Sequence, residues 1–228
     1  MKATWLGHAA WLLEGKDKIV VDPFLTGNPK ATKKASDIKC SIVVVTHGHN
    51  DHFGDAIEIA KANKATLCAI HELATYAETQ GVKVEDMNKG GAVKVRGTTV
   101  RLVEAVHSGD YVAPRVGMIP GGSSAGAVIE SGATVYHAGD TALFSDMKLI
   151  GQLYKPHVAL LPIGDRYTMG AREAGWAAAF VEAPMTVPIH YNTWPIIEAD
   201  PFDFEESAKK RGYKGEVTIL NPGESMQF

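Results

Sequence analysis

One short segment constrains this chain more than any other: residues 46–52 read Thr-His-Gly-His-Asn-Asp-His. It follows the apolar run 41–45 (Ser-Ile-Val-Val-Val), which is typical of a buried strand. Loops at strand ends carry chemistry because a rigid scaffold positions them. Three imidazoles and a carboxylate at such a place predict a site for divalent metal.

The spacing within this segment predicts two sites rather than one. His47 and His49 lie two residues apart in an extended stretch, so they point to the same side and can share one ion. Asp51 and His52 follow one turn later, where residues 53–55 are expected to open a helix, and point elsewhere. The alternative is a histidine-rich surface turn, which explains neither the strand before the segment nor the helix after it.

Length and charge limit the classes of protein to consider. With 228 residues and 45% apolar composition, the chain can bury a full core as one domain over 1–228, made of two βα halves, roughly 1–120 and 121–228. The 23 basic and 26 acidic residues show no basic block, which disfavours nucleic acid as a partner. A small-molecule substrate is expected instead, and homo-oligomers are left open.

The compartment is predicted from the start of the chain and from the cysteines. The first residues lack the apolar core of a signal peptide, and no stretch reaches membrane-spanning length, so a cytoplasmic location without membrane contact is expected. Cys40 and Cys68 are far apart and flanked by apolar residues. They are interpreted as buried free thiols, in preference to a disulfide or metal ligands.

Strand and helix signals alternate along the whole chain. Strands are expected at 2–6, 10–13, 18–21, 42–45, 65–70, 82–84, 93–95, 100–106, 125–130, 134–137, 157–163, 186–189 and 217–220. Helices are expected at about 55–62, 73–79, 145–154, 171–182 and 202–210, and a loop rich in Gly, Pro and Ser at 108–124. This order predicts an α/β protein with two βα halves packed sheet to sheet and helices outside.

Two metal sites need more ligands than residues 46–52 supply, and three further residues fit. His107, Asp140 and His190 each end an apolar run. A lone histidine is more often a core or surface residue, but together these strand ends would present ligands on one rim.

The order His-x-His-x-Asp-His, His, Gly-Asp, His resembles the metallo-β-lactamase fold superfamily. Six further segments narrow the resemblance to one branch of this superfamily. They are 5–9 (Trp-Leu-Gly-His-Ala), 21–24 (Val-Asp-Pro-Phe), 26–29 (Thr-Gly-Asn-Pro), 137–141 (His-Ala-Gly-Asp-Thr), 161–164 (Leu-Pro-Ile-Gly) and 188–191 (Pro-Ile-His-Tyr). They are similar to the small metal-dependent hydrolases related to ascorbate-6-phosphate lactonase. The resemblance spans nearly the whole chain and implies an αββα four-layer sandwich, with two mixed sheets face to face and helices outside.

The resemblance also implies which residues hold which ion. It assigns one ion to His47, His49 and His107, the other to Asp51, His52 and His190, and a bridging role to Asp140. Two divalent ions are expected, with Zn²⁺ favoured and Mn²⁺, Ni²⁺ or Fe²⁺ as alternatives.

Two departures from better-known relatives bear on the chemistry. Asp140 stands where the best-known zinc β-lactamases use cysteine, which disfavours antibiotic hydrolysis. His49 stands where the diiron oxygen-reducing relatives usually carry glutamate, which disfavours redox chemistry.

The resemblance implies a hydroxide activated by two metals, which attacks an ester, lactone or phosphoester bond of a small molecule. Asp51 is expected to be catalytic, since a ligating carboxylate can orient the nucleophile and shuttle its proton. His8 is predicted at the mouth of the site and Arg166 on the same rim, both as substrate-binding residues, against the alternatives of a structural histidine and a solvated charge. Asp22 is predicted to hold a ligand histidine by its free N–H.

Two other functions compete with this one. A nuclease or phosphodiesterase acting on nucleic acid uses the same ligands, but such relatives usually add a clamping arm or a domain. A non-catalytic metal-binding module would be expected to have lost ligands, whereas all seven positions are filled.

Overall fold

The computed structural model describes residues 1–228, the whole chain. One seven-stranded sheet has the order β16-β1-β2-β3-β4-β5-β6. Its first four strands pair antiparallel and the remaining pairs, from β3 to β6, are parallel. The strands are β1 (Lys2–Gly7), β2 (Ala10–Glu14), β3 (Lys18–Val21), β4 (Ile42–Val44), β5 (Thr66–Ile70), β6 (Lys83–Met87) and β16 (Ser225–Gln227).

The second seven-stranded sheet mirrors the first, in the order β15-β14-β13-β12-β11-β8-β7. Strands β12 to β15 are parallel, and β11 pairs antiparallel with β12 and β8. The strands are β7 (Ala92–Val95), β8 (Thr98–Glu104), β11 (Ala125–Glu130), β12 (Thr134–His137), β13 (Val158–Pro162), β14 (Met185–Ile189) and β15 (Glu216–Val217).

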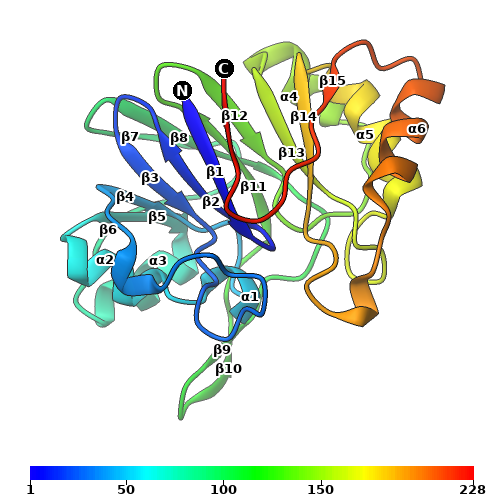
Figure 1. The fold of residues 1–228 in the computed structure, drawn as a ribbon. Helices are drawn as coiled ribbons and strands as arrows, with labels where there is room; N and C mark the ends of the chain where they lie inside the picture. Colours follow the sequence, from blue (N-terminus) through cyan, green and yellow to red (C-terminus); the bar gives the residue numbers. More distant parts are fainter.

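Helices cover the outer sides of the two sheets (Figure 1). On the first sheet, α2 contacts β4 and β5, while α3 contacts β5 and β6. On the second sheet, α5 contacts β13 and packs between α4 and α6. The αββα four-layer sandwich expected from the sequence is therefore confirmed. The helices are α1 (Asn50–Phe53), α2 (Ala56–Asn63), α3 (His71–Thr79), α4 (Met147–Tyr154), α5 (Ala171–Val181) and α6 (Pro201–Lys210), with 3₁₀ turns at Ala35–Asp37 and Pro195–Ile197.

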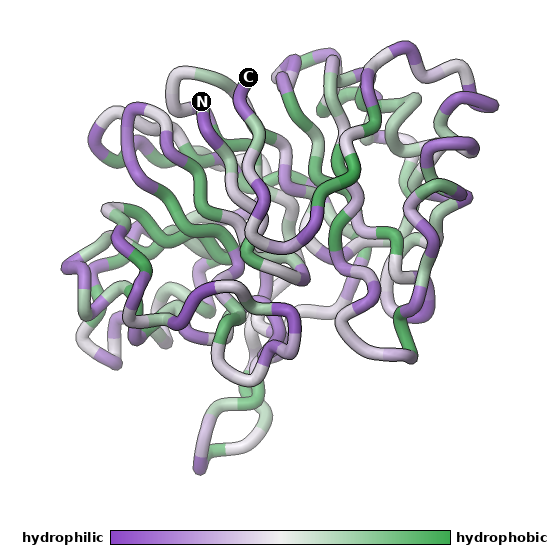
Figure 2. Tube along the Cα trace, viewed as in Figure 1, coloured by the Kyte–Doolittle hydropathy of each residue, from purple (hydrophilic) through white to green (hydrophobic).

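The layered packing explains which segments are apolar throughout. The central parallel strands β4, β5 and β13 are buried at every position, because a sheet covers one of their faces and helices the other. Figure 2 shows this as hydrophobic strands inside and hydrophilic turns outside. Sixty-four buried residues from both sheets and the helices form one contiguous apolar cluster.

Strand directions bring one set of strand ends together. Within the first sheet β1, β3 and β4 run the same way, and within the second β8, β12 and β14 do. At the opposite end of the sandwich the sheets are tied together, since the Lys16 amide donates to the Ser131 carbonyl (3.1 Å) and the Asp17 amide to Ser131 Oγ (3.2 Å). Both chain termini also lie at that far end (Figure 1).

Several elements differ from the sequence prediction. The expected loop 108–124 contains a hairpin, β9 (Tyr111–Ala113) and β10 (Gly117–Ile119), which stands clear of the body (Figure 1). The strand expected at 217–220 is only Glu216–Val217, and the chain instead closes with β16, paired to β1 at the other sheet. Likewise β7 and β8 belong to the second sheet, so the sheets do not divide at residue 120.

The helix expected at about 55–62 is confirmed as α2, but a separate short helix precedes it. Asp51 and His52 already lie in a helical turn, α1, which ends at Gly54. Gly54 has φ 30°, and a Cβ there would lie 2.8 Å from Phe24 Cα, so the helix is interrupted at this glycine before α2 begins.

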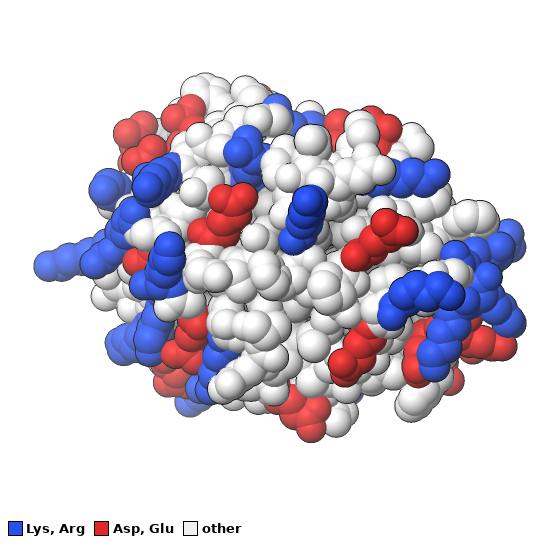
Figure 3. All heavy atoms as spheres, turned by 90° about the horizontal axis from the view of Figure 1, so that it is seen from above, with Lys and Arg blue, Asp and Glu red and all other residues white.

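The surface and the helices give two further facts. On the end of the molecule that carries both termini, basic and acidic side chains are interspersed (Figure 3). None of the helices combines the length and the apolar composition needed to cross a membrane.

Candidate metal centre

All the predicted ligands lie where strands end on one rim of the sandwich. His47 and His49 follow β4, with Asp51 and His52 in α1 directly after them, while His107, Asp140 and His190 follow β8, β12 and β14. The structure gathers eight donors into two groups, in each of which the ligand atoms lie within 4.8 Å of one another. The groups are His47, His49, His107, Asp140 and His8, Asp51, His52, His190.

The first group presents three ring nitrogens to one point. His49 Nδ1 lies 3.0 Å from His47 Nε2 and 3.2 Å from His107 Nε2. Ligands about 2.05 Å from a tetrahedral ion stand about 3.3 Å apart, so these spacings are close to those of a ligated ion. The prediction that His47 and His49 face the same side agrees with this geometry.

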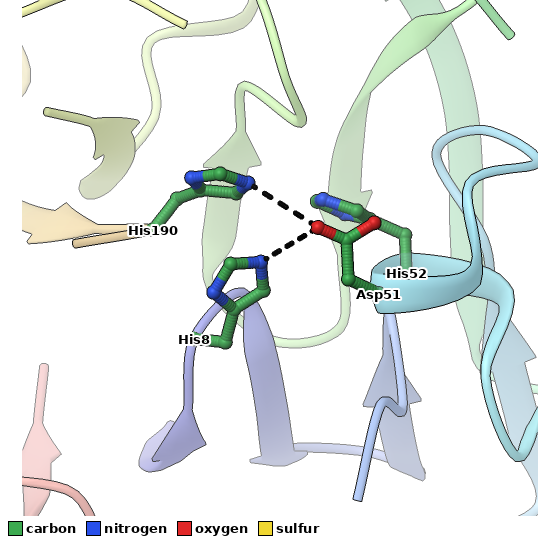
Figure 4. A group of neighbouring side chains, drawn as sticks. All are labelled: His8, Asp51, His52 and His190. Carbon is green, nitrogen blue, oxygen red and sulfur yellow. Dashed lines mark hydrogen bonds and ion pairs between the residues drawn. The ribbon is translucent and has the colours of Figure 1, made fainter. Parts of the chain in front are cut away.

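The second group is built around Asp51 (Figure 4). Asp51 Oδ2 lies 3.2 Å from His8 Nε2 and 3.8 Å from His190 Nε2. His52 completes the group from the next position of α1, and its ring stacks on that of His190 with centroids 5.5 Å apart. The group thus combines one carboxylate with three imidazoles.

Asp140 lies between the two groups. Its Oδ1 is 3.1 Å from His52 Nε2, and its Oδ2 is 3.1 Å from His190 Nε2. The same Oδ2 is 3.7 Å from His107 Nε2 and 3.9 Å from His47 Nε2, in the first group. One carboxylate therefore faces donors of both groups, as a bridging ligand would.

Buried polar atoms without hydrogen bonds show that this site fits metal. His52 Nε2, both ring nitrogens of His190 and Asp140 Oδ1 are buried and lack any hydrogen-bond partner. His52 Nε2 and Asp140 Oδ1 are 3.1 Å apart, yet they are not aligned for a hydrogen bond. Unpaired buried polar atoms are costly, and atoms that converge without pairing are expected where a cation lies between them.

A buried carboxylate fixes the orientation of two of these histidines. Asp22, fully buried at the end of β3, accepts hydrogen bonds from the Thr46 amide (2.8 Å) and Thr46 Oγ1 (2.7 Å). It also lies 2.8 Å from His52 Nδ1, which therefore carries the proton and donates. Since Thr46 Oγ1 gives its own proton to Asp22, it accepts from His47 Nδ1 at 3.0 Å. Both rings thus turn Nε2 toward the site, the arrangement that supports metal ligation.

Charge inside the centre shifts the ionisation of its members. Burial works against ionisation of Asp140, but the facing rings of His190 and His52 outweigh it and hold the Asp140 pKa well below its usual range. Burial likewise opposes charge on His190, yet Asp140 raises the pKa of His190 to about 9. Burial, helped by His190, lowers the pKa of His8 to about 4, so His8 is neutral at pH 7.

The centre is partly open to solvent. Asp51 and His107 have side chains 29% and 13% exposed, whereas the side chains of His47 and His52 are inaccessible. A molecule approaching the centre therefore meets Asp51, His107 and the half-buried His49 before the buried histidines.

The base of the β9–β10 hairpin packs on the loop that carries the predicted ligands His47 and His49. The Gly48 amide donates to the Gly109 carbonyl at 3.2 Å, and a Cβ on Gly48 would lie 2.5 Å from that oxygen. Glycine between the two predicted ligands, His47 and His49, is therefore required by this close approach. Ser108 Oγ, beside it, lies 3.3 Å from His49 Nε2.

The residues predicted to bind substrate are placed differently from one another. His8 lies deeper than the predicted mouth of the site: it is 1% exposed, within the second group. Arg166 is exposed on the loop after β13, with its guanidinium 5.6 Å from the centre of the Tyr167 ring, and it contacts no donor of either group. Its role stays a prediction.

Sequence reasoning missed three hydroxyl residues of the centre. Thr46 and Ser108 adjoin ligand histidines in the chain, a signal that could have identified them. Thr193, whose Oγ1 lies 2.7 Å from His8 Nδ1, is 185 positions from its partner, so no local pattern points to it.

Comparisons with known proteins bear on this geometry. The family model for a beta-lactamase superfamily domain matches residues 17–191. A UPF0173 metal-dependent hydrolase from Archaeoglobus fulgidus is 48% identical over 229 residues, with 100% of this chain and 99% of that protein covered. A UPF0173 metal-dependent hydrolase from Methanopyrus kandleri is 49% identical, with 100% of both chains covered. Among solved structures, Igni18, a metallo hydrolase from Ignicoccus hospitalis, is 37% identical with a TM-score of 0.88, covering 100% of this chain and 98% of that one.

Proposed function

Because this chain belongs to the metallo-β-lactamase superfamily and is a metal-dependent hydrolase, we propose that it binds two divalent ions and hydrolyses an ester, lactone or phosphoester bond of a small molecule. One observation carries the proposal: two adjacent groups of donors share Asp140, whose carboxylate faces histidines of both. Two ions bound in these adjacent groups could act together, one on the nucleophile and the other on the leaving group.

The donor set supports the choice of ion. Eight residues supply six imidazoles and two carboxylates, and imidazole is a preferred ligand of zinc. We propose Zn²⁺ as the resident ion, with Mn²⁺, Ni²⁺ or Fe²⁺ as alternatives that the two carboxylates also suit. When bound, such ions lower the pKa of a coordinated water toward about 7 and polarise the oxygen of the bond to be cleaved.

The chain's own residues would divide the remaining work. Asp51 is the more exposed of the two carboxylates, at 29% against 3% for Asp140. This exposure supports the proposal that Asp51 would orient the attacking hydroxyl and pass its proton to the leaving group. Asp22, through His52 directly and through Thr46 to His47, keeps two ligand rings in one tautomer during the reaction.

The competing functions are less well supported. The 23 basic and 26 acidic residues give a net charge of −3 with no basic block along the sequence, which does not favour a nucleic-acid backbone as the ligand. The non-catalytic alternative is set aside, because the full-length relatives are metal-dependent hydrolases. Both cysteines are unpaired, which fits the cytoplasm as the proposed compartment.

The test is metal content followed by turnover. Protein purified without chelator or affinity metal is analysed for metal per chain. It is then loaded with Zn²⁺ or Mn²⁺ and assayed on a generic phosphodiester, a lactone and an oligonucleotide. About two ions per chain with metal-dependent turnover is the expected result. Failure to bind two ions after loading refutes the dinuclear proposal, and preferential cleavage of oligonucleotides favours the nuclease alternative.

A further inference from the structure

His8 is the one imidazole of the second group to which the sequence resemblance assigns no role as a metal ligand. It occupies the turn between β1 and β2 with φ 57°, a left-handed conformation that is uncommon for a residue other than glycine. The His8 carbonyl accepts from Trp5 Nε1 (2.9 Å) and from the His190 amide (3.2 Å). The backbone of a predicted ligand, His190, is thus tied to the backbone of His8.

The His8 ring is held as firmly as its backbone. It is 1% exposed, and its centroid lies 4.0 Å from that of His190 and 5.6 Å from that of His52. Nδ1 lies 2.7 Å from Thr193 Oγ1, which turns Nε2 toward Asp51 Oδ2 at 3.2 Å (Figure 4). Two ligands that stand at right angles on an ion, each about 2.1 Å from it, are about 3.0 Å apart.

We propose that His8 is itself a ligand of the second ion, through Nε2, and that Thr193 fixes the required tautomer by accepting the Nδ1 proton. The proposal rests on the two-ion function given above. It adds an eighth protein ligand to the seven predicted from the sequence, drawn from the first turn of the chain.

With His8 as a ligand, the two sites would differ in the number of protein donors. The first ion would be bound by His47, His49, His107 and Asp140, four protein donors. The second would be bound by Asp51, His52, His190, His8 and, since both its oxygens face this group, Asp140. With solvent added, the second site is the one of higher coordination number.

A simpler role competes with ligation. Nε2 could carry the proton and donate it to Asp51, with Thr193 donating to Nδ1 instead, because a hydroxyl can serve either way. His8 would then only position Asp51. The two roles differ in whether the second ion senses the imidazole directly.

Co²⁺ loading separates these roles without using turnover. Wild type, His8→Ala and Thr193→Val are titrated with Co²⁺ while visible absorption and bound metal per chain are measured. For His8→Ala we expect affinity for the second Co²⁺ to fall by more than about 100-fold, beyond the 10–100-fold typical of a lost supporting hydrogen bond. Absorption per bound ion should rise, since a site with fewer ligands absorbs more strongly. Thr193→Val keeps the imidazole and should lose only about 10-fold.

Added imidazole gives the decisive readout. A cavity of about 170 Å³ adjoins His8, between Trp5, Tyr191 and Asn221, so imidazole has a route into His8→Ala. Restoration of the wild-type Co²⁺ spectrum by imidazole is the expected result. His71→Ala, at an exposed histidine paired to Asp86, is the control and should bind Co²⁺ as wild type does.

Each failure points to a different conclusion. If His8→Ala binds the second Co²⁺ with the wild-type spectrum, the ligand assignment is overturned. Weaker binding that imidazole does not restore also overturns it and leaves His8 as a positioning residue for Asp51. If wild type binds fewer than two Co²⁺, the proposed dinuclear function fails. If the spectrum of the one bound ion is then unchanged in His8→Ala, the assignment of His8 as a metal ligand fails as well.

Discussion

Replacing Asp22 by asparagine should weaken metal binding although Asp22 touches no ion. The carboxylate is fully buried and accepts three hydrogen bonds, at 2.8 Å from the Thr46 amide, 2.7 Å from Thr46 Oγ1 and 2.8 Å from His52 Nδ1. Asparagine has the same shape but offers only one acceptor oxygen. If that oxygen stays on the Thr46 amide, its NH₂ group faces Thr46 Oγ1 and His52 Nδ1, both of which are donors in the native protein.

The consequence for His52 sets the magnitude. Facing an NH₂ group, Nδ1 must accept, so the neutral ring moves its proton to Nε2, the nitrogen that would bind the ion. Losing the hydrogen bond to a charged acceptor costs about 1.5–3 kcal/mol. Loss of a carboxylate behind a ligand histidine typically weakens metal affinity about 10–100-fold, or about 1.4–2.7 kcal/mol. The two ranges agree, so we expect a decrease of that size for the ion bound by His52.

Competition with a chromophoric chelator, combined with elemental analysis, measures this decrease. Asp55→Asn is the matched control, because Asp55 is also a buried carboxylate and accepts from the Leu25 and Thr26 amides, both at 2.8 Å. Asp55 contacts no ligand histidine, so its variant should lower the melting temperature without changing metal affinity. Wild-type affinity for both ions in Asp22→Asn would refute the reasoning that ring tautomer controls ligation here.

Three further predictions follow from the same structure. Asp140→Ala should reduce bound metal well below two ions per chain and abolish turnover, because it removes the carboxylate between the two groups; two ions by elemental analysis would contradict the bridging assignment. Burial raises the pKa of Cys40 to about 11 and of Cys68 to about 12, so at pH 8 a thiol reagent should label the native chain slowly. The same reagent should label the urea-unfolded chain at both cysteines, and rapid labelling of the native chain would contradict the prediction. The double variant Val112→Ser with Met118→Ser should change the free energy of unfolding by less than about 1 kcal/mol, since these hairpin side chains are 49% and 72% exposed. A larger decrease in the free energy of unfolding, measured by urea denaturation, would mean that these side chains pack against another part of the protein.

Local sequence was sufficient for most strands and for the ligand loop. The runs around β4, β5 and β13 are continuously apolar because both of their faces are covered, and that pattern can be read without a structure. It was insufficient for β16, whose three residues form a strand only because Met226 meets Ala3 at the far end of the chain. It was also insufficient for the β9–β10 hairpin, which was hidden by the Gly, Pro and Ser content of residues 108–124.

What the sequence determined by itself is the chemistry: six closely spaced residues with three imidazoles and a carboxylate, followed by single donors at later strand ends. What only the tertiary structure decided is which donors meet. Parallel strand directions bring the ends of β1, β4, β8, β12 and β14 to one rim, and the Asp140 carboxylate there faces both groups. His8 and Thr193 lie 185 positions apart, and their 2.7 Å contact depends on sheet packing that no local pattern encodes. Ligand identity is thus a local property of the chain, whereas ligand grouping is a property of the fold.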